Sequence, residues 1–353
     1  MSNHYLHLGR TPSGASLTWD FSDSTCANRH LLVTGTSGSG KSFAIRYLME
    51  QATRQCRVLI FDLTGEYQKS ASCFPNAKLL DPSVAPLAVN GFLQTGSPSS
   101  PQRPFCAANT VASLITGCFG LSQKQHAILY DAAKRYLLQP GSRSSFGDFM
   151  SFFLSEAPKK KGIPAQPSIN VLQPLVDQHL FAGGQRQDWL LRTPGITIYC
   201  LAALPGRSQQ AVTQLLLSDL LSCIRETGNV DDPFIVIIDE FQRLGFHTES
   251  PASILLTEGR KYGCSLWLAS QFLMGRFDPE ALFCLEQAAI RLRFSPPASE
   301  LPSLARQLAA QSSFDSPQWK KALGSLQTGR CIASLPGMPE PILCHIGSAQ
   351  ASS

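Results

Sequence analysis

A glycine-rich octapeptide, GTSGSGKS, occupies residues 35 to 42 and indicates the class of fold. Its residues are, in order, Gly35, Thr36, Ser37, Gly38, Ser39, Gly40, Lys41 and Ser42. The octapeptide fits the full phosphate-loop pattern, whose glycines let backbone N–H groups turn inward around phosphate oxygens. In this pattern the lysine reaches the β and γ phosphates and the serine holds magnesium. We therefore expect the chain to bind ATP with Mg²⁺.

The segments on either side of the loop have the character that a phosphate loop needs. Residues 30–34 (HLLVT) predict a buried strand, and residues 41–54 place apolar side chains at helical spacing. Residues 57–62 (RVLIFD) predict a second buried strand that ends in an acid. Strand, loop, helix and strand form the beginning of a parallel α/β sheet, and the helix points its positive end at the phosphates.

Acidic and amide side chains follow two further predicted strands. Residues 234–240 (FIVIIDE) form an almost continuous apolar run, typical of a strand buried on both faces, and end in Asp239 and Glu240. An acid at this point of a phosphate-loop enzyme holds magnesium through water, and a second acid can polarise the attacking water. Gln271 follows the predicted strand 265–270, and a neighbouring position in the sheet would bring it to the γ phosphate and the water. This arrangement predicts hydrolysis of ATP.

Length, net charge and cysteine content limit the classes of protein to which this chain can belong. With 353 residues, of which 43% are hydrophobic, the chain is long enough for one large α/β domain with an insertion, or for two modest domains. The net charge of +5 permits a nucleic-acid partner without arguing for one. The eleven cysteines include no CxxC pair, which argues against zinc and thioredoxin-type sites. Unpaired thiols, no export signal and short apolar runs predict a cytoplasmic protein without direct membrane insertion.

Four blocks in this order resemble the HerA/FtsK superfamily of ring-forming motor ATPases. They are residues 30–42 (HLLVTGTSGSGKS), 62–67 (DLTGEY), 234–240 (FIVIIDE) and 258–271 (EGRKYGCSLWLASQ). The resemblance covers about 31–90 and 196–346. It implies a RecA-like core in a hexameric ring, with ATP and Mg²⁺ between subunits. It assigns Lys41 and Ser42 to the phosphate loop, Asp239 and Glu240 to the magnesium and base positions, and Gln271 to the sensor glutamine.

The same resemblance assigns a role to Arg260. It matches the arginine that HerA-like subunits push into the neighbour's site, where it neutralises charge on the transferring phosphate only in the assembled ring. Gly263 is expected to end the helix that carries Arg260 in a left-handed conformation. The other interpretation of Arg260 is a cation favoured by the dipole at a helix end.

The predicted organisation is an α/β fold in three parts. Residues 1–29 form a short β-hairpin region, residues 30–90 and 195–347 form the RecA-like core, and residues 91–194 form a helical insertion. Lys159–Lys161 within the insertion is interpreted either as a solvated loop or as a phosphate contact. The sequence given lacks the amino-terminal barrel of archaeal HerA and the membrane segments and winged-helix domain of FtsK. Its short lead-in looks more like the ATPase parts of conjugation or DNA-restriction systems.

The resulting hypothesis is a ring-forming ATPase that translocates or pumps double-stranded DNA through phosphate contacts, without sequence preference. The candidate DNA contacts are Arg207 and Gln242-Arg243. One alternative is a scaffold ATPase whose ring assembles a partner nuclease or other effector. Another is a secretion or packaging motor that acts on protein or RNA.

Overall fold

The computed structural model describes residues 5–21, 23, 26, 28–54, 56–74, 76–89, 101–139, 145–156, 164–182, 195–273 and 277–347. The predicted contact at Lys159–Lys161 lies outside these residues. The strands are β1 (Tyr5–Arg10), β2 (Ser16–Asp20), β3 (Leu31–Thr34), β4 (Arg57–Asp62), β5 (Lys78–Leu80), β6 (Leu87–Ala88), β7 (Phe181–Ala182), β8 (Ile196–Cys200), β9 (Phe234–Ile238), β10 (Cys264–Ser270), β11 (Ile290–Arg293), β12 (Arg330–Ser334) and β13 (Ile342–Ile346).

The helices follow the strands along the chain and include several short 3₁₀ turns. The α-helices are α1 (Lys41–Ala52), α2 (Glu66–Lys69), α3 (Arg103–Phe119), α4 (Gln123–Leu137), α5 (Phe146–Glu156), α6 (Gln166–Asp177), α8 (Gly206–Thr227), α9 (Pro251–Glu258), α10 (Pro279–Leu285), α11 (Leu301–Ala309) and α12 (Ser316–Gly324). The 3₁₀ turns are η1 (Ala71–Cys73), η3 (Phe241–Leu244) and η4 (Gly259–Tyr262). In the described part of the chain, every helix is too short or too polar to cross a bilayer.

One large sheet organises the described residues. It has eleven strands in the order β2-β1-β13-β12-β11-β3-β10-β9-β4-β8-β5. From β11 to β5 neighbouring strands are parallel, whereas β12, β13, β1 and β2 are joined by antiparallel pairing. The predicted α/β fold with a mainly parallel sheet is confirmed. The amino-terminal hairpin is not separate from this sheet, because β1 pairs with β13 and extends it.

Each central strand sends alternate side chains into two cores. In β9, Ile235 and Ile237 pack into the core that contains α1, whereas Val236 and Ile238 pack into the core that contains α8 and α9. All four side chains are fully buried. Burial of a side chain of this size contributes about 1.5–3 kcal/mol. The sheet is therefore covered on both faces, as the continuous apolar run predicts.

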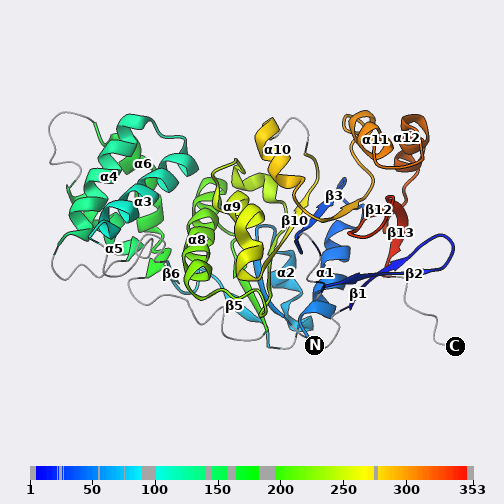
Figure 1. The fold of residues 1–353 in the computed structure, drawn as a ribbon. Helices are drawn as coiled ribbons and strands as arrows, with labels where there is room; N and C mark the ends of the chain where they lie inside the picture. Colours follow the sequence, from blue (N-terminus) through cyan, green and yellow to red (C-terminus); the bar gives the residue numbers. More distant parts are fainter. Residues whose placement is uncertain are drawn as a thin grey trace.

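The helices of the 91–194 segment gather at one end of the molecule, and the pair α11–α12 lies at the other (Figure 1). The short parallel pair of β6 with β7 links the chain just before this segment to the chain near its end. Helices α3 and α8 pack against each other, which joins the four helices to the sheet's second core. The proposed insertion thus begins and ends at neighbouring points of the fold.

The structure adds elements that the sequence patterns did not indicate and divides one that they did. The elements that were not predicted are strands β5, β6 and β7, helices α2 and α11, and the 3₁₀ turns η1 and η3. The helix predicted from Ser250 to Tyr262 is α-helical only to Glu258 and continues as the 3₁₀ turn η4. Gly263 then has φ +76°, the left-handed conformation that was expected to end it.

His30 gives the fold a pH dependence that can be measured. Its Nδ1 accepts a hydrogen bond from the backbone N–H of Leu266 at 2.9 Å, and burial lowers its pKa from 6.5 to about 4. Between these values the unfolded chain binds the proton and the folded chain does not. His30 should therefore lower the free energy of unfolding by about 3 kcal/mol as the pH falls from 6.5 to 4.

Replacement of His30 by asparagine isolates this effect, because the Asn oxygen can accept the same hydrogen bond and does not titrate. Denaturant unfolding of both proteins between pH 7 and pH 4 measures the difference. We expect the wild-type protein to lose stability relative to His30→Asn over this range. Parallel curves for the two proteins would show that His30 is not the group that titrates.

Candidate active site

The glycine-rich loop is anchored to the ends of two strands beside its own. It connects β3 to α1. The Gly35 N–H donates to the Ser270 carbonyl at 3.2 Å, and the Thr36 N–H donates to the Ser295 carbonyl at 2.8 Å. Gly40 has φ +113°, and a Cβ atom there would lie 3.1 Å from the backbone nitrogen of Gly329. Because α1 begins at Lys41, the N–H groups of its first turn lack helical acceptors and are available to an anion.

Two polar side chains at the end of the loop, those of Lys41 and Ser42, have partners within the site. Lys41 is buried, and its Nζ donates to the Thr36 carbonyl at 3.0 Å. Ser42 Oγ donates to Asp239 Oδ2 at 3.2 Å, across 197 residues of sequence. The structure therefore brings together the serine and the acid that were both predicted to hold magnesium.

Glu240 has an unusual backbone and two amide partners. Its φ of +57° lies in the left-handed region, which costs a non-glycine residue on the order of 1–3 kcal/mol and is concentrated at functional sites. Gln271 Nε2 donates to both carboxylate oxygens at 3.0 and 3.1 Å, and Gln242 Nε2 donates to Oε2. Gln271 lies at the carboxyl end of β10, beside β9, where the sequence predicted it. Gln242 as a partner of Glu240 was missed.

The charges in the site leave an excess of negative charge. Burial raises the pKa of Asp239 to about 6, and the nearby carboxylates of Glu240 and Glu66 add to this, whereas Ser42 and Lys41 act in the opposite direction. Burial also lowers the pKa of Lys41, although the same three carboxylates favour its charged form. One lysine thus faces three acids. A divalent cation would relieve this imbalance, and Mg²⁺ prefers carboxylate, hydroxyl and phosphate oxygens.

The turn after β4 brings a further acid and a tyrosine to the same edge. Asp62 is fully buried and accepts N–H groups from Thr64, Gly65 and Gln68, so it shapes this turn. The turn places the Tyr67 hydroxyl 3.5 Å from Asp239 Oδ2. The sequence singled out the 62–67 block without a role for its members. Its position beside β9 in the sheet explains why it faces the site.

Arg260 lies away from these residues. It is exposed on η4, before the amino end of β10, whereas Gln271 follows the carboxyl end of that strand. Seven residues of strand between them span about 23 Å. Of the candidate DNA contacts, Arg207 is exposed at the start of α8 and Arg243 is exposed on η3, whereas the Gln242 side chain is held by Glu240.

The segment just before β12 packs against the glycine-rich loop. The Gly329 N–H donates to the Ser39 carbonyl at 2.9 Å, and the Thr328 hydroxyl donates to the Gly38 carbonyl at 3.4 Å. These contacts join positions 290 residues apart. A local sequence pattern does not predict these contacts, because they depend on where β12 lies in the sheet.

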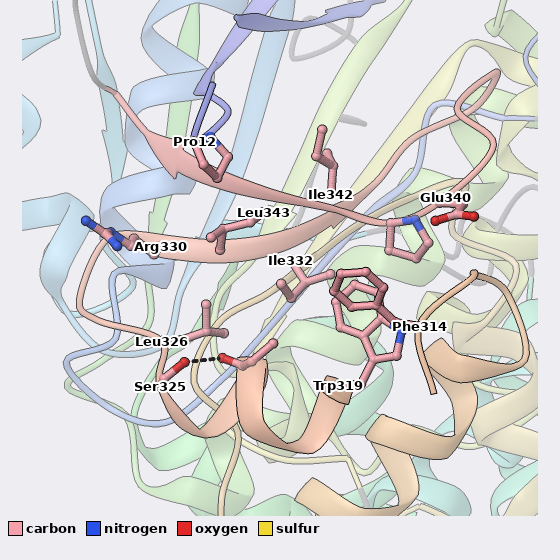
Figure 2. A pocket seen from close by; sticks show the side chains of 12 residues that line it. Pro12, Phe314, Trp319, Ser325, Leu326, Arg330, Ile332, Glu340, Ile342 and Leu343 are labelled. Atoms are coloured by element: carbon pink, nitrogen blue, oxygen red, sulfur yellow. Dashed lines mark hydrogen bonds between the residues drawn. The ribbon is translucent and has the colours of Figure 1, made fainter. Parts of the chain in front are cut away.

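A separate cavity of about 340 Å³ lies between α12 and strands β12 and β13. Figure 2 shows Trp319, Ile332 and Leu343 along its apolar wall, with Arg330 at one end and Glu340 at the other. Ile332 and Trp319 belong to the small core beneath α11 and α12, whereas Cys331, the residue before Ile332, packs into the core of α1. The cavity therefore lies on the face of the sheet opposite α1.

Comparisons with known proteins found similarity both in sequence and in fold. Residues 6–104 match the family described as "Helicase HerA, central domain". No curated protein matches the sequence. The structure resembles VirB4 of Thermoanaerobacter pseudethanolicus, with a TM-score of 0.74, 16% identity, and coverage of 98% of this chain and 96% of that one.

A second set of similar structures consists of the bacterial conjugative coupling protein TrwB. The unbound form gives a TM-score of 0.65 at 13% identity, over 98% of this chain and 89% of TrwB. TrwB in complex with ADP and Mg²⁺ gives 0.64 at 15% identity, over 92% and 87%. The resemblance predicted from the motifs is confirmed: residues 6–104 are similar in sequence to the HerA central domain, and the chain shares its fold with VirB4 and TrwB over nearly its whole length.

Proposed function

We propose that the protein is an ATP-hydrolysing motor that assembles as a ring, most simply a hexamer, and translocates double-stranded DNA. The observation that carries the proposal is the convergence of five side chains from three parts of the sequence at one edge of the sheet. They are Lys41, Ser42, Asp239, Glu240 and Gln271. Their chemistry matches the requirements of phosphoryl transfer to water.

In this proposal each side chain has a separate task. Lys41 binds the β and γ phosphates of ATP. Ser42 and Asp239 supply oxygen donors for Mg²⁺, which when bound neutralises developing phosphate charge. Glu240 takes a proton from the attacking water as the water oxygen bonds to the γ phosphorus. The bond from this phosphorus to the β–γ bridging oxygen breaks, and ADP and phosphate are released.

The amide contacts of Glu240 supply a point of control. In the structure, Gln271 and Gln242 both donate to its carboxylate, which engages the lone pairs that a base needs. Movement of either amide away from the carboxylate would free a further lone pair for the proton that Glu240 accepts from water. Gln271 is the amide that the γ phosphate would attract. Gln242 precedes the exposed Arg243, which offers a route by which a bound partner reaches the base.

The position of Arg260 supports the proposed ring. Subunits of a ring join head to tail, so the surface that completes a neighbour's site differs from the surface that carries the subunit's own site. Arg260 is exposed at the opposite edge of the sheet from Glu240 and Gln271. It is therefore available to a neighbour and not to its own nucleotide.

The proposed substrate is duplex DNA, as part of a conjugation or DNA-restriction system. The family match to the HerA central domain and the fold shared with a conjugative coupling protein support this choice. Contacts would be made to phosphates by basic side chains such as Arg207 and Arg243. Binding should then weaken steeply with salt and show no sequence preference.

ATP turnover with and without nucleic acid tests the substrate. We expect duplex DNA to raise the steady-state ATPase rate several-fold at low salt, and the increase to shrink as salt rises. Single-stranded RNA of equal length serves as the competing substrate. Lys41→Ala, which loses the phosphate-binding lysine, controls for contaminating ATPase activity and should show no turnover in either condition.

The outcomes separate the proposed motor from its rivals. Turnover that duplex DNA leaves unchanged, but that a partner protein raises, would replace the motor with a scaffold ATPase that presents a nuclease or other effector. Stimulation by RNA alone would assign the motor to RNA. Turnover of ATP by Lys41→Ala at the wild-type rate would remove the ATPase assignment itself.

A further inference from the structure

The strand order fixes the direction in which a nucleotide lies on the loop. Asp239, Glu240 and Gln271 come from β9 and β10, which lie on one side of β3. These residues mark the γ-phosphate end of the site. The nucleoside must therefore leave the loop toward the other side of β3, where β11, β12 and β13 follow in order. This inference rests on the proposed binding of ATP.

On that side the loop is bordered by the chain segments before β12 and after β13. Strand β12 starts at this edge of the sheet and β13 ends there, because both are antiparallel to their neighbours. Thr328 and Gly329, just before β12, bond to Gly38 and Ser39. Gly347, just after β13, lies against α1. The segments that flank β12 and β13 therefore lie beside the first turn of α1 at the nucleoside end of the site.

One aromatic side chain stands at this border. Phe43 directly follows Ser42 in the first turn of α1, and half of it is exposed (50%). Its ring stacks on Tyr47 with 6.2 Å between centroids and 12° between planes, and the Tyr47 hydroxyl lies 2.8 Å from His7 Nδ1. A Cβ atom on Gly347 would lie 2.9 Å from the Phe43 ring. The ring is therefore held in place on one face and at its edge.

We propose that Phe43 is the platform on which the nucleobase of the bound nucleotide stacks. An apolar ring that is held rigid and left half exposed suits a flat apolar partner. The cavity beside Trp319 is a less suitable place, because its apolar wall lies on the face opposite α1. An aromatic ring contacts the face of a base and not its hydrogen-bonding edge, so the platform does not distinguish ATP from GTP.

Binding measurements with three anions test the platform. The dissociation constants of Mg²⁺-ATP, Mg²⁺-GTP and Mg²⁺-tripolyphosphate are measured for the wild-type protein and for Phe43→Ala. We expect Phe43→Ala to weaken ATP and GTP by a similar factor, about five- to one hundredfold, which is the range of base–aromatic stacking. Tripolyphosphate has no base, and its affinity should not change.

Two further variants act as matched controls. Phe43→Trp keeps a flat ring and should retain the affinity for both nucleotides. Phe283→Ala removes another exposed phenylalanine, 67% accessible on α10, and should leave all three affinities unchanged.

Each other outcome overturns the platform. Equal weakening of ATP and tripolyphosphate in Phe43→Ala would mean that Phe43 supports the phosphate loop. Unchanged affinity with a smaller assembly on size-exclusion chromatography would mean that Phe43 covers a subunit contact. If the wild-type protein binds neither ATP nor tripolyphosphate, the proposed ATPase function itself is refuted. This outcome differs from every outcome that refutes only the platform.

Discussion

Glu240→Gln is expected to bind Mg²⁺-ATP with the wild-type affinity and to hydrolyse it about a hundred- to ten-thousandfold more slowly. The exchange replaces the carboxylate that accepts the proton by an amide of the same size, so it removes the general base. The phosphate contacts of Lys41 and Ser42 are not altered. Affinity by calorimetry and phosphate release in a single turnover measure the two properties separately.

A matched carboxylate elsewhere in the same segment controls for the loss of charge. Glu249 is exposed nine residues further along, and Glu249→Gln should turn over at the wild-type rate. A Glu240→Gln protein with undiminished hydrolysis would place the base elsewhere. Glu66, whose charge also acts on Asp239, would then be the next carboxylate to replace.

Arg260→Ala is expected to bind ATP normally and to lose about a thousandfold or more in hydrolysis. Losses of this size follow removal of an arginine that stabilises the transferring phosphate from a neighbouring subunit. Lys261 is the exposed cation next to it on η4, and Lys261→Ala should retain full activity. The comparison separates a specific role of the guanidinium from a general effect of charge on this turn.

Mixing two inactive proteins decides where Arg260 acts. Arg260→Ala subunits retain Glu240, and Glu240→Gln subunits retain Arg260, so some interfaces of a mixed ring hold both groups. Activity that partly returns on mixing places Arg260 in trans. Full activity of Arg260→Ala alone would leave it as a cation at a helix end. Arg243, exposed at the carboxyl edge of the sheet, would then be the arginine to test.

Short, continuous patterns in the sequence were enough to predict several parts of this protein. The octapeptide from Gly35 to Ser42 predicted the phosphate loop, because the glycines and the start of the helix that bind phosphate are neighbours in sequence. The apolar run that ends in Asp239 and Glu240 predicted a strand buried on both faces. The sheet confirms that strand, and it confirms the neighbouring strand that carries Gln271.

Contacts that depend on strand order and on backbone conformation appear only in the folded structure. Gln242 bonds to Glu240 because Glu240 adopts a left-handed conformation that turns η3 back toward it. Thr328 reaches Gly38 because β12 lies two strands from β3, although 290 residues separate the two positions. Such pairings follow from how strands assemble side by side, and this depends on the summed burial of many distant side chains. A local sequence pattern does not contain this information about distant side chains. These contacts are therefore seen only in the folded chain.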